Sequence, residues 1–365
     1  MKKVYKTIIL GSGIIGSTIA YHLSKQEDGI LIIDKHAPAS GTSSATQAWV
    51  WVHTKKPDFY AELSMYSSEL YLNLKKELSY EFEFHRSGGI TPIFTEEEWE
   101  NAEKLVQTQK KVGINVKLLS KKRALKKEPA LNPSIIGAMY SPLDAHVNPM
   151  RLVYSLIKEA EKNGVQTSFY NEVIFAEKLD AGGYKVETQQ GTFFAERLVI
   201  AGGPWAPQIG KWFDIDIPIE LVKGQIMVTE PIQPIIKHIV RGMRQTNNGE
   251  LLIGMSSERT GFDRSTTFDV LKQSAQLASH LIPALEDVKI VRHFAGIRAV
   301  PKDKLPIFGE VDGHEGLFVA ATHSGITLAP IIGLLMTEII SGKEPTISYD
   351  PYDIKRFEKS NKVEV

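Results

Sequence analysis

The segment Gly11-Ser12-Gly13-Ile14-Ile15-Gly16 is the feature that most limits how this chain can fold. It follows an apolar run over 4–10 that is rich in β-branched residues, and it precedes a helical pattern over 15–25. A second apolar run, 29–34, ends in Asp34. Glycines at this spacing allow a pyrophosphate to approach a helix N-terminus, and an acid at the end of the next strand can accept hydrogen bonds from a ribose. The pattern therefore predicts a βαβ unit that binds a dinucleotide.

Composition excludes several kinds of chemistry. The 365 residues include 43 Lys+Arg and 43 Asp+Glu, so the formal net charge is zero and no overall field attracts nucleic acid or an anionic membrane. The chain has no cysteine, which excludes disulfides, thiolate nucleophiles, zinc–thiolate and iron–sulfur sites, and attachment of a flavin through cysteine. No cluster with metal-ligand spacing stands out. We therefore expect an enzyme that acts on a small molecule and holds no metal.

Two apolar stretches are too interrupted to be targeting or membrane segments. The first follows Lys2 and Lys3 and is broken by the three glycines of the fingerprint. The second, 316–340, contains polar or helix-breaking residues at four positions, His323, Ser324, Pro330 and Glu338. We expect a cytoplasmic protein.

Predicted elements follow the opening unit in a definite order. Helical periodicity occurs over 59–78, 96–112 and 149–163, and strands are expected at 173–178, 184–188, 192–195 and 197–201. From 222 to 298 the pattern changes to alternating strands, with a helix over 269–281 and a strand over 288–297. The string Asn247-Asn248-Gly249 indicates a hairpin between strands 239–246 and 250–255. A strand over 317–321 and a helix over 327–341 close the chain.

This order indicates an α/β fold, α+β overall, in two discontinuous domains. A Rossmann-type cofactor domain is expected from 1–80, 143–218 and 299–365. A substrate domain, built on an antiparallel sheet, is expected from 81–142 and 219–298. The substrate would enter between them.

The loop directly after Asp34 bears on which dinucleotide binds. Its sequence, Ser40-Gly41-Thr42-Ser43-Ser44-Ala45-Thr46-Gln47, is rich in small hydroxyl side chains that can donate to phosphate and ribityl oxygens. The same composition also suits a plain polar loop. The glycine fingerprint alone does not separate NAD from FAD. An NAD-dependent dehydrogenase would explain the fingerprint, but not this loop or a helix that begins near Gly325.

Further strings, in order along the chain, resemble the D-amino-acid oxidase superfamily of FAD-dependent oxidoreductases, which includes glycine oxidase, D-amino-acid dehydrogenase and sarcosine oxidase. They are Asn148-Pro149-Met150-Arg151-Leu152, Ile200-Ala201-Gly202-Gly203-Pro204-Trp205, Lys223-Gly224-Gln225, Gly296-Ile297-Arg298 and the stretch from His323 to Pro330. Within the superfamily, Met243-Arg244-Gln245-Thr246 and the stretch from His323 to Leu328 look most like flavoprotein subunits of opine oxidases, hydroxyproline dehydrogenase and hydrogen cyanide synthase. Those subunits are commonly assembled with partner chains.

The resemblance implies FAD, bound without a covalent link by residues from several segments. Residues 325–328 begin a helix whose N–H groups would face the part of the flavin where negative charge gathers on reduction. The alternative is that Gly325 only allows close packing. The residues that the resemblance assigns to the cofactor are Gly11, Gly13, Ile14, Ile15, Gly16, Asp34, Lys35, Gly41, Thr42, Ser43, Ser44, Gln47, Ala48, Trp49, Val173, Ala201, Gly202, Trp205, Gly325, Ile326, Thr327 and Leu328.

Three residues are candidates for contact with the substrate. Arg298 ends an apolar strand and matches the arginine that binds the substrate carboxylate in the glycine oxidase group, where a guanidinium offers a bidentate fork. Arg244 stands on the hairpin where that group has a pocket tyrosine, which puts glycine as substrate in doubt. It is either a second anion clamp, for a dicarboxylate or an opine, or a salt-bridged strand residue. His323 either contacts substrate or flavin or is structural.

The expected reaction is oxidation of the carbon–nitrogen bond of a small amino acid or secondary amine, such as glycine, sarcosine, a D-amino acid, a D-proline derivative or an opine. Hydride would pass from the α-carbon to flavin N5, which needs orientation and an unprotonated amine more than a dedicated base. A different class of function is a flavoprotein subunit of a heteromeric electron-transfer dehydrogenase, inactive alone. Association into a homo-oligomer is the alternative to assembly with partner subunits. The sequence does not indicate whether oxygen, a quinone or a partner subunit accepts the electrons.

Overall fold

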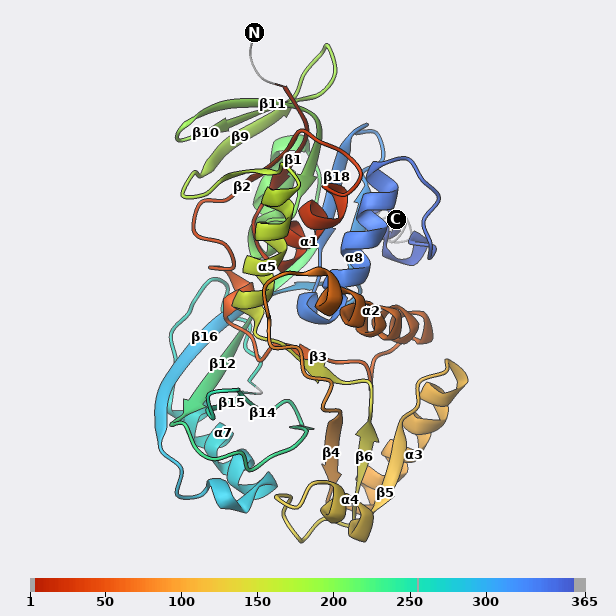
Figure 1. The fold of residues 1–365 in the computed structure, drawn as a ribbon, viewed down its shortest axis with the longest axis vertical. Coiled ribbons are helices and arrows are strands. Elements are labelled where there is room, and N and C mark those ends of the chain that lie inside the picture. Colours follow the sequence, from red (N-terminus) through yellow and green to blue (C-terminus); the bar gives the residue numbers. More distant parts are fainter. Residues whose placement is uncertain (1–3, 255, 358–365) are drawn as a thin grey trace, which may run out of the picture.

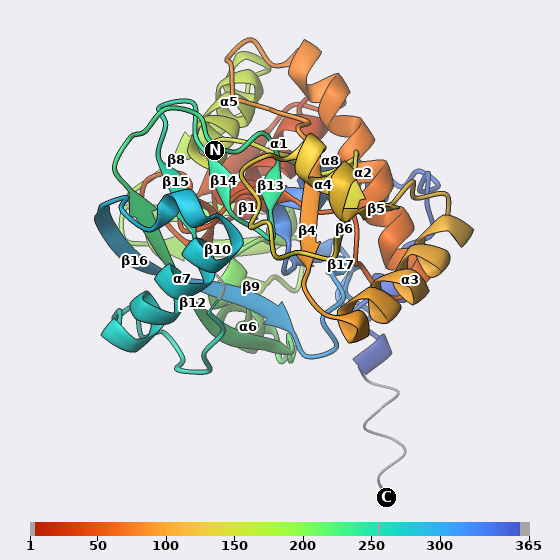
Figure 2. The same cartoon turned by 90° about the horizontal axis from the view of Figure 1, so that it is seen from below.

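A computed structural model describes residues 4–254 and 256–357. A large sheet with its helices forms one end of the molecule, and two smaller sheets form the other (Figure 1). Figure 2, seen from the end of the smaller sheets, shows that these two sheets lie beside each other. The molecule therefore contains both parallel and antiparallel strands, as the sequence predicts.

The large sheet has a parallel centre with antiparallel additions. Its strands β18, β11, β1, β2 and β8 run parallel in that order; β17 pairs antiparallel with β18, and the ribbon of β9 and β10 pairs antiparallel with β11. Strands covered on both faces are apolar throughout, as the four buried residues of β2 show. The bounds are β1 Val4–Leu10, β2 Ile30–Ile33, β8 Gln166–Ser168, β9 Val173–Lys178, β10 Tyr184–Thr188, β11 Gly191–Ile200, β17 Ile307–Glu310 and β18 Leu317–Ala321.

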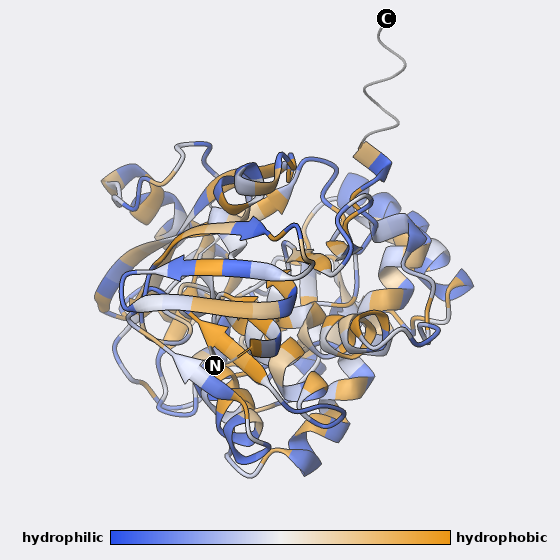
Figure 3. Ribbon diagram, turned by 90° about the horizontal axis from the view of Figure 1, so that it is seen from above, coloured by the Kyte–Doolittle hydropathy of each residue, from blue (hydrophilic) through white to orange (hydrophobic). Residues whose placement is uncertain are grey.

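The large sheet separates two hydrophobic cores. Successive residues of a strand point to opposite faces, so Ile9 belongs to one core while Ile8 and Leu10 belong to the other. On the first face α1 packs against α5 and α8, and α2 packs against α8. Figure 3 shows apolar residues concentrated on the inner strands and polar residues on the outer surfaces. The helices are α1 Ile14–Leu23, α2 Asp58–Glu77, α5 Pro149–Lys162, α6 Ala206–Gly210 and α8 Gly325–Ile340.

The two smaller sheets share a third core. One sheet is antiparallel, in the order β14, β15, β12 and β16, and the other has the order β13, β4, β6 and β5. Residues of both, including Met227 and Ile90, pack together with α7. The bounds are β4 Gly89–Ile93, β5 Lys117–Ser120, β6 Gly137–Ser141, β12 Ile219–Thr229, β13 Ile239–Val240, β14 Arg244–Gln245, β15 Leu251–Ile253, β16 Ile290–Pro301, α3 Glu96–Lys111, α4 Lys121–Lys127 and α7 Phe268–Leu281.

The segment 41–57 joins the two ends of the molecule. Its strand β3 (Trp49–Val50) pairs with β7 (Ala145–His146). Thr42 Oγ1 donates a hydrogen bond of 2.5 Å to the carbonyl of Ile297 on β16. A Cβ on Gly296 would lie 2.5 Å from the Cβ of Ala45, so β16 runs directly against this segment. The contact fixes the antiparallel sheet relative to the glycine turn.

Two predicted strands differ from those observed. The strands expected at 192–195 and 197–201 are one continuous strand, β11, which pairs with β10 in its first half and with β1 in its second. The strand expected at 239–246 is instead two short strands in different sheets, because Arg241 (φ 46°) and Gly242 (φ 88°) turn the chain between β13 and β14. Met255, at the end of the expected hairpin, lies outside the described residues.

No helix within the described ranges is long and apolar enough to cross a membrane. The residue boundaries of the two domains stay a prediction.

Candidate functional site

A cavity of about 1450 Å³ lies where the large sheet meets the sheet of β12 and β16. Pockets for a single small ligand usually measure about 300–1000 Å³, so this one has room for a larger molecule. Its walls come from the glycine turn, the loop after β2, the ends of β11 and β18, the start of α8 and strand β16. The expected residues that line it are Gly11, Gly13, Ile14, Ile15, Asp34, Lys35, Gly41, Thr42, Ser43, Gln47, Trp49, Val173, Ala201, Gly202, Trp205, Arg298, His323, Gly325, Ile326 and Thr327.

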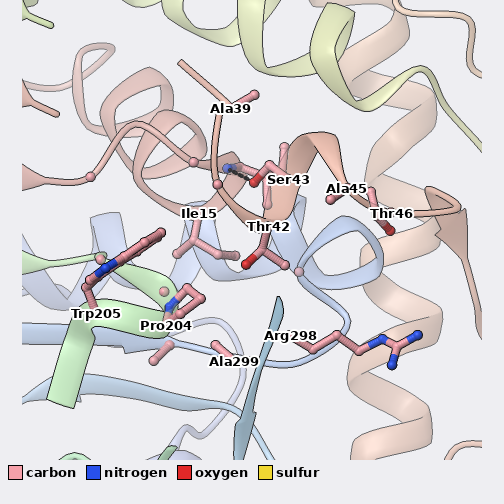
Figure 4. Close-up of a pocket in the computed structure, with 18 of the residues that line it drawn as sticks. Ile15, Ala39, Thr42, Ser43, Ala45, Thr46, Pro204, Trp205, Arg298 and Ala299 are labelled. Carbon is pink, nitrogen blue, oxygen red and sulfur yellow. Dashed lines mark hydrogen bonds between the residues drawn. The ribbon is translucent and has the colours of Figure 1, made fainter. Parts of the chain in front are cut away.

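The glycine turn leaves room that a side chain would fill. Gly11 has φ 111°, and a Cβ there would lie 2.6 Å from the carbonyl oxygen of Ala201. Helix α1 begins after Gly13, which has no side chain to cap it. The Ile14 N–H, at the first position of the helix, donates to Ser43 Oγ at 2.9 Å (Figure 4). The N-terminus of α1 therefore meets the cavity with the positive end of its dipole, which suits an anionic group such as a pyrophosphate.

Asp34 is held on the cavity wall by its neighbours. Its Oδ2 accepts from the Ser12 N–H at 2.7 Å and from the Ser12 hydroxyl at 2.8 Å, and its Oδ1 accepts from the His36 N–H at 2.9 Å. An ionised carboxylate has about four acceptor positions, so it can accept a further hydrogen bond. The arrangement fits a ribose hydroxyl.

One end of the cavity is aromatic. Trp205 packs on Gly41, where a Cβ would lie 3.4 Å from the indole, and it stacks on Phe262 with ring centroids 5.5 Å apart. Lys35 Nζ lies 4.2 Å from the Trp205 ring centroid. In Figure 4 Trp205 stands at one side of the view and Arg298 at the other, with Thr42 and Ser43 between them. The cavity therefore extends from this aromatic end to the arginine.

Arg298 is a cation without an anionic partner among the described residues. It lies on β16, and its Nη1 donates to the carbonyls of Ser256 at 3.0 Å and Lys223 at 3.5 Å. Burial lowers the pKa of its guanidinium. A carboxylate ligand would compensate this charge through a bidentate pair.

Arg244 does not line the cavity, whereas Arg241 does. The Arg244 side chain is 5% exposed, its Nε donates to the carbonyl of Gln47, and burial lowers its pKa to about 10. It therefore holds the Gln47 loop from the side away from the cavity. It forms no salt bridge with a described residue. Arg241, three residues before Arg244, lines the cavity instead. The turn between β13 and β14 changes which side chain of this segment faces inward.

Two tryptophans form a further wall. Trp49 and Trp51 are stacked with centroids 5.2 Å apart, and both line the cavity. The Trp49 indole N–H donates to Asp144 Oδ2 at 2.7 Å, and the fully buried Asp144 also accepts from His53 Nδ1 at 2.7 Å. The Trp51 indole N–H is buried and has no acceptor among the described residues. It is therefore an unsatisfied donor inside the wall.

The N-terminus of α8 also meets the cavity. Ser324 precedes it in a left-handed conformation (φ 59°), the helix has no acidic residue in its first turn, and Gly325 to Thr327 line the cavity. A Cβ on Gly325 would lie 3.2 Å from Ile14 Cγ2, so this glycine also allows close packing. His323 lines the cavity just before the helix, and burial, with the positive charges of Lys55 and Arg298, lowers its pKa to about 3.

Four other expected cofactor residues do not line the cavity: Gly16, Ser44, Ala48 and Leu328. Gly16 is needed for packing, since a Cβ would lie 2.0 Å from the Gly11 carbonyl oxygen. Ala48 and Leu328 are fully buried in the first core. The sequence pattern did not indicate the cavity residues Trp51 and Arg241, or Lys55 and Asp144 behind the wall, because only long-range contacts bring them there. No group of His, Asp and Glu within 4–254 and 256–357 could hold a metal.

Comparison with known proteins places this geometry in a family. The family model described as FAD dependent oxidoreductase (DAO) matches residues 6–339. A glycine oxidase from Geobacillus kaustophilus is 32% identical, over 96% of this chain and 97% of that protein. Hydrogen cyanide synthase subunit HcnC of Pseudomonas protegens is 29% identical (98% and 97% covered), and an opine oxidase subunit of Agrobacterium tumefaciens is 27% identical (96% and 96% covered).

The crystal structure of glycine oxidase from Geobacillus kaustophilus superposes with a TM-score of 0.91 at 30% identity, covering 96% of this chain and 98% of that one. The predicted fold class, a mixed α/β cofactor domain with an antiparallel substrate domain, is confirmed.

Proposed function

Because the chain belongs to the DAO family of FAD-dependent oxidoreductases, we propose that it oxidises the carbon–nitrogen bond of a small amino acid or secondary amine. The observation that carries the proposal is Arg298, a half-buried guanidinium on the cavity wall with no anionic partner among the described residues. A carboxylate on the substrate would supply that partner. Glycine, sarcosine, a D-amino acid, a D-proline derivative and an opine all carry one.

FAD would be held without a covalent bond, by groups that already face the cavity. The N-terminus of α1 would bind the pyrophosphate, Asp34 the ribose, and the backbone at Val173 the adenine. The uncapped N-terminus of α8 would meet the ring system, where its dipole favours negative charge. When bound, FAD accepts the hydride that leaves the substrate α-carbon.

The chain's own residues would orient the substrate. Arg298 would bind the carboxylate, and the stacked Trp49 and Trp51 would limit the space around the rest of the molecule. Arg241 would give the cavity a second guanidinium, which favours an acid with a second anionic group, such as an opine, over glycine.

A second candidate function is that of a flavoprotein subunit in a larger assembly. Two relatives that match this chain over nearly its whole length are named as subunits, one of hydrogen cyanide synthase and one of opine oxidase. Copurification with a second chain, and turnover only in its presence, would favour this function. A homo-oligomer that turns over alone with oxygen or a dye would contradict it. A cytoplasmic location stays a prediction.

The visible spectrum of the purified protein tests the main proposal. It is recorded without oxygen, before and after addition of glycine, sarcosine, D-alanine, D-hydroxyproline and octopine in turn. We expect a flavin spectrum that one of these compounds bleaches, and release of FAD into the supernatant after denaturation would show that the link is not covalent. A colourless protein that added FAD does not turn yellow would overturn the proposal.

A further inference from the structure

Behind the cavity wall lies a buried lysine that the proposed reaction has not used. Lys55 is 4% exposed and follows β3 in the segment 41–57. No carboxylate of a described residue forms an ion pair with it. Its Nζ instead lies 3.9 Å from the ring centroid of Trp51 and 5.2 Å from that of Tyr60. Lysines are rarely buried without a paired charge, so this one calls for a physical reason.

Lys55 is connected to the cavity by hydrogen bonds. Its Nζ donates to Ser324 Oγ at 2.7 Å, and Ser324 Oγ lies 3.0 Å from His323 Nδ1. Both Ser324 and His323 line the cavity. The other ring nitrogen, His323 Nε2, has no hydrogen-bond partner among the described residues. A continuous path for a proton therefore runs from the cavity, through an imidazole and a hydroxyl, to a buried amine.

The surrounding groups determine which member of this path changes charge. Burial lowers the pKa of Lys55 to about 7, although the negative charge of Asp144, from the β6–β7 side, acts in the opposite direction. Burial, Lys55 and Arg298 of β16 lower the pKa of His323 to about 3, and burial raises the pKa of Tyr60 on α2 to about 12. The imidazole thus stays neutral near pH 7, where Lys55 can gain or lose a proton.

We propose that His323, Ser324 and Lys55 form a relay that removes the proton from the substrate's ammonium group. The proposal rests on the proposed amine oxidation. Before transfer, Lys55 is a neutral amine that accepts from the Ser324 hydroxyl, Ser324 accepts from His323 Nδ1–H, and His323 Nε2 accepts from the substrate N–H. Three protons then move one step each. The substrate proton passes to His323 Nε2, the Nδ1 proton of His323 passes to Ser324 Oγ, and the Ser324 hydroxyl proton passes to Lys55 Nζ.

The net change is one proton moved from the substrate nitrogen to Lys55, with no change in the electrons of the protein. Lys55 then donates a hydrogen bond to Ser324, because an ammonium group can donate but cannot accept. The substrate nitrogen gains a free lone pair, which is needed to form the C=N bond as the hydride leaves. His323 is the catalytic residue that would touch the substrate, and Ser324 and Lys55 act through it.

A pH profile tests the relay in the FAD-loaded protein. The rate of anaerobic flavin bleaching is measured with the compound identified in the spectral screen. We expect the wild-type rate to rise through about pH 7. In Lys55→Met the rate at pH 7 should fall ~100-fold, in the range of general base effects. It should recover to the wild-type value at a pH where the substrate amine is itself unprotonated.

Three further variants separate proton transfer from packing and charge. Lys55→Arg keeps a cation but cannot take up a proton, so it should follow the profile of Lys55→Met. Ser324→Ala breaks the path in the middle and should do the same. Lys56→Met changes an exposed neighbouring lysine and should keep the wild-type profile. The relay would be overturned if Lys55→Arg bleached the flavin at the wild-type rate at pH 7. It would also be overturned if the bleaching rate of Lys55→Met were reduced by the same factor at every pH.

A second measurement needs no substrate. The lysine side chains are labelled with ¹³C at Cε, and the resonance missing from the Lys55→Met spectrum is followed with pH in the FAD-loaded protein. We expect this resonance to titrate near neutral pH, and titration only above pH ~9, close to the ordinary lysine pKa, would overturn the relay. This titration distinguishes the two proposals. If no amine bleaches the flavin, the proposed function fails, and the relay with it, even where Lys55 titrates as expected.

Discussion

The guanidinium of Arg298 lies directly over the α-carbon of Gly224 on the neighbouring strand. A Cβ at position 224 would lie 2.2 Å from Arg298 Nη2, while the two strands β12 and β16 pair in regular antiparallel register around them. The clashing atoms are at the far end of a flexible side chain, so the side chain would move before the strand does. The absence of a side chain at Gly224 therefore determines where the Arg298 guanidinium points.

Replacing Gly224 by alanine should weaken substrate binding with little effect on folding. We expect Gly224→Ala to raise KM by about 10-fold, the cost of one impaired hydrogen bond to a charged group, while the melting temperature changes by only a few degrees. Steady-state kinetics and thermal unfolding measure the two effects. In the Arg298→Ala background the same change should add nothing; a full additional loss there would show that Gly224 acts by another route.

Removing the Arg298 guanidinium should affect the substrate and not the cofactor. Arg298→Ala should raise KM at least ~100-fold, since a bidentate pair with a carboxylate is lost, and the flavin content should stay at the wild-type level. Arg298→Lys keeps the positive charge but loses the two-pronged guanidinium, so its KM should lie between those of the wild type and Arg298→Ala. Near-normal kinetics for Arg298→Ala would contradict the assignment.

Asp34 should determine how tightly the cofactor binds. Asp34→Ala removes the proposed acceptor for the ribose and also leaves the Ser12 N–H without its bond, so we expect FAD to be lost on gel filtration. Ser12→Ala removes only the hydroxyl donor to Asp34 and is the matched control, which should retain FAD. The ratio of absorbance at 450 nm to that at 280 nm reports the outcome. Full flavin in Asp34→Ala would argue against the role of Asp34.

Asp144 should be needed to hold the tryptophan wall. Its carboxylate accepts from Trp49 Nε1 and His53 Nδ1 in a fully buried position, and Asp144→Ala leaves these donors without a partner. We expect a loss of at least about 3 kcal/mol of unfolding free energy, measured by urea denaturation, and a changed tryptophan fluorescence in the folded state. Asp180→Ala, on an exposed turn, should change neither. Equal stability of the two variants would contradict the prediction.

Lys55 should make the stability of the protein depend on pH. Its pKa is about 7 when folded and close to 10.5 when unfolded, so between these values the unfolded state binds more protons and stability rises with pH, by at most about 1.4 kcal/mol per pH unit. Below about pH 7 the cost of burying the charge is fully present. Lys55→Met should therefore be more stable than the wild type at pH 6, and this advantage should shrink towards pH 10. A constant difference across this range would be inconsistent with a depressed lysine pKa.

The parts of the fold that sequence could predict are those that local pattern determines. The glycine turn, the apolar strand β2 and the helix α5, whose N-cap Asn148 accepts from the Arg151 N–H, each depend on neighbouring residues. Most cavity residues fall on such segments. The residue boundaries of the domains and the roles of the individual site residues still await the experiments above.

The parts that sequence could not predict depend on distant contacts. Arg241 faces the cavity and Arg244 does not, because the chain turns between β13, in one sheet, and β14, in another. Hydrophobic alternation does not show which sheet a short strand joins. In the sequence Lys55 looks like one more lysine beside Lys56, and it differs only through its burial and its distant contacts with Trp51, Tyr60 and Ser324. Asp144 likewise gains its importance from Trp49 and His53, far away in the sequence.

The strand order of the large sheet has a consequence for how the protein is made. Strands β1 and β2 are synthesised well before β11 and β18, yet β1 lies between β2 and β11, and β11 in turn pairs with β18. Until then the nascent chain exposes an apolar strand edge that is prone to wrong pairing. Productive folding of this half should therefore wait for β11 and β18, and the edge exposed until then should make its yield in cells depend on chaperones.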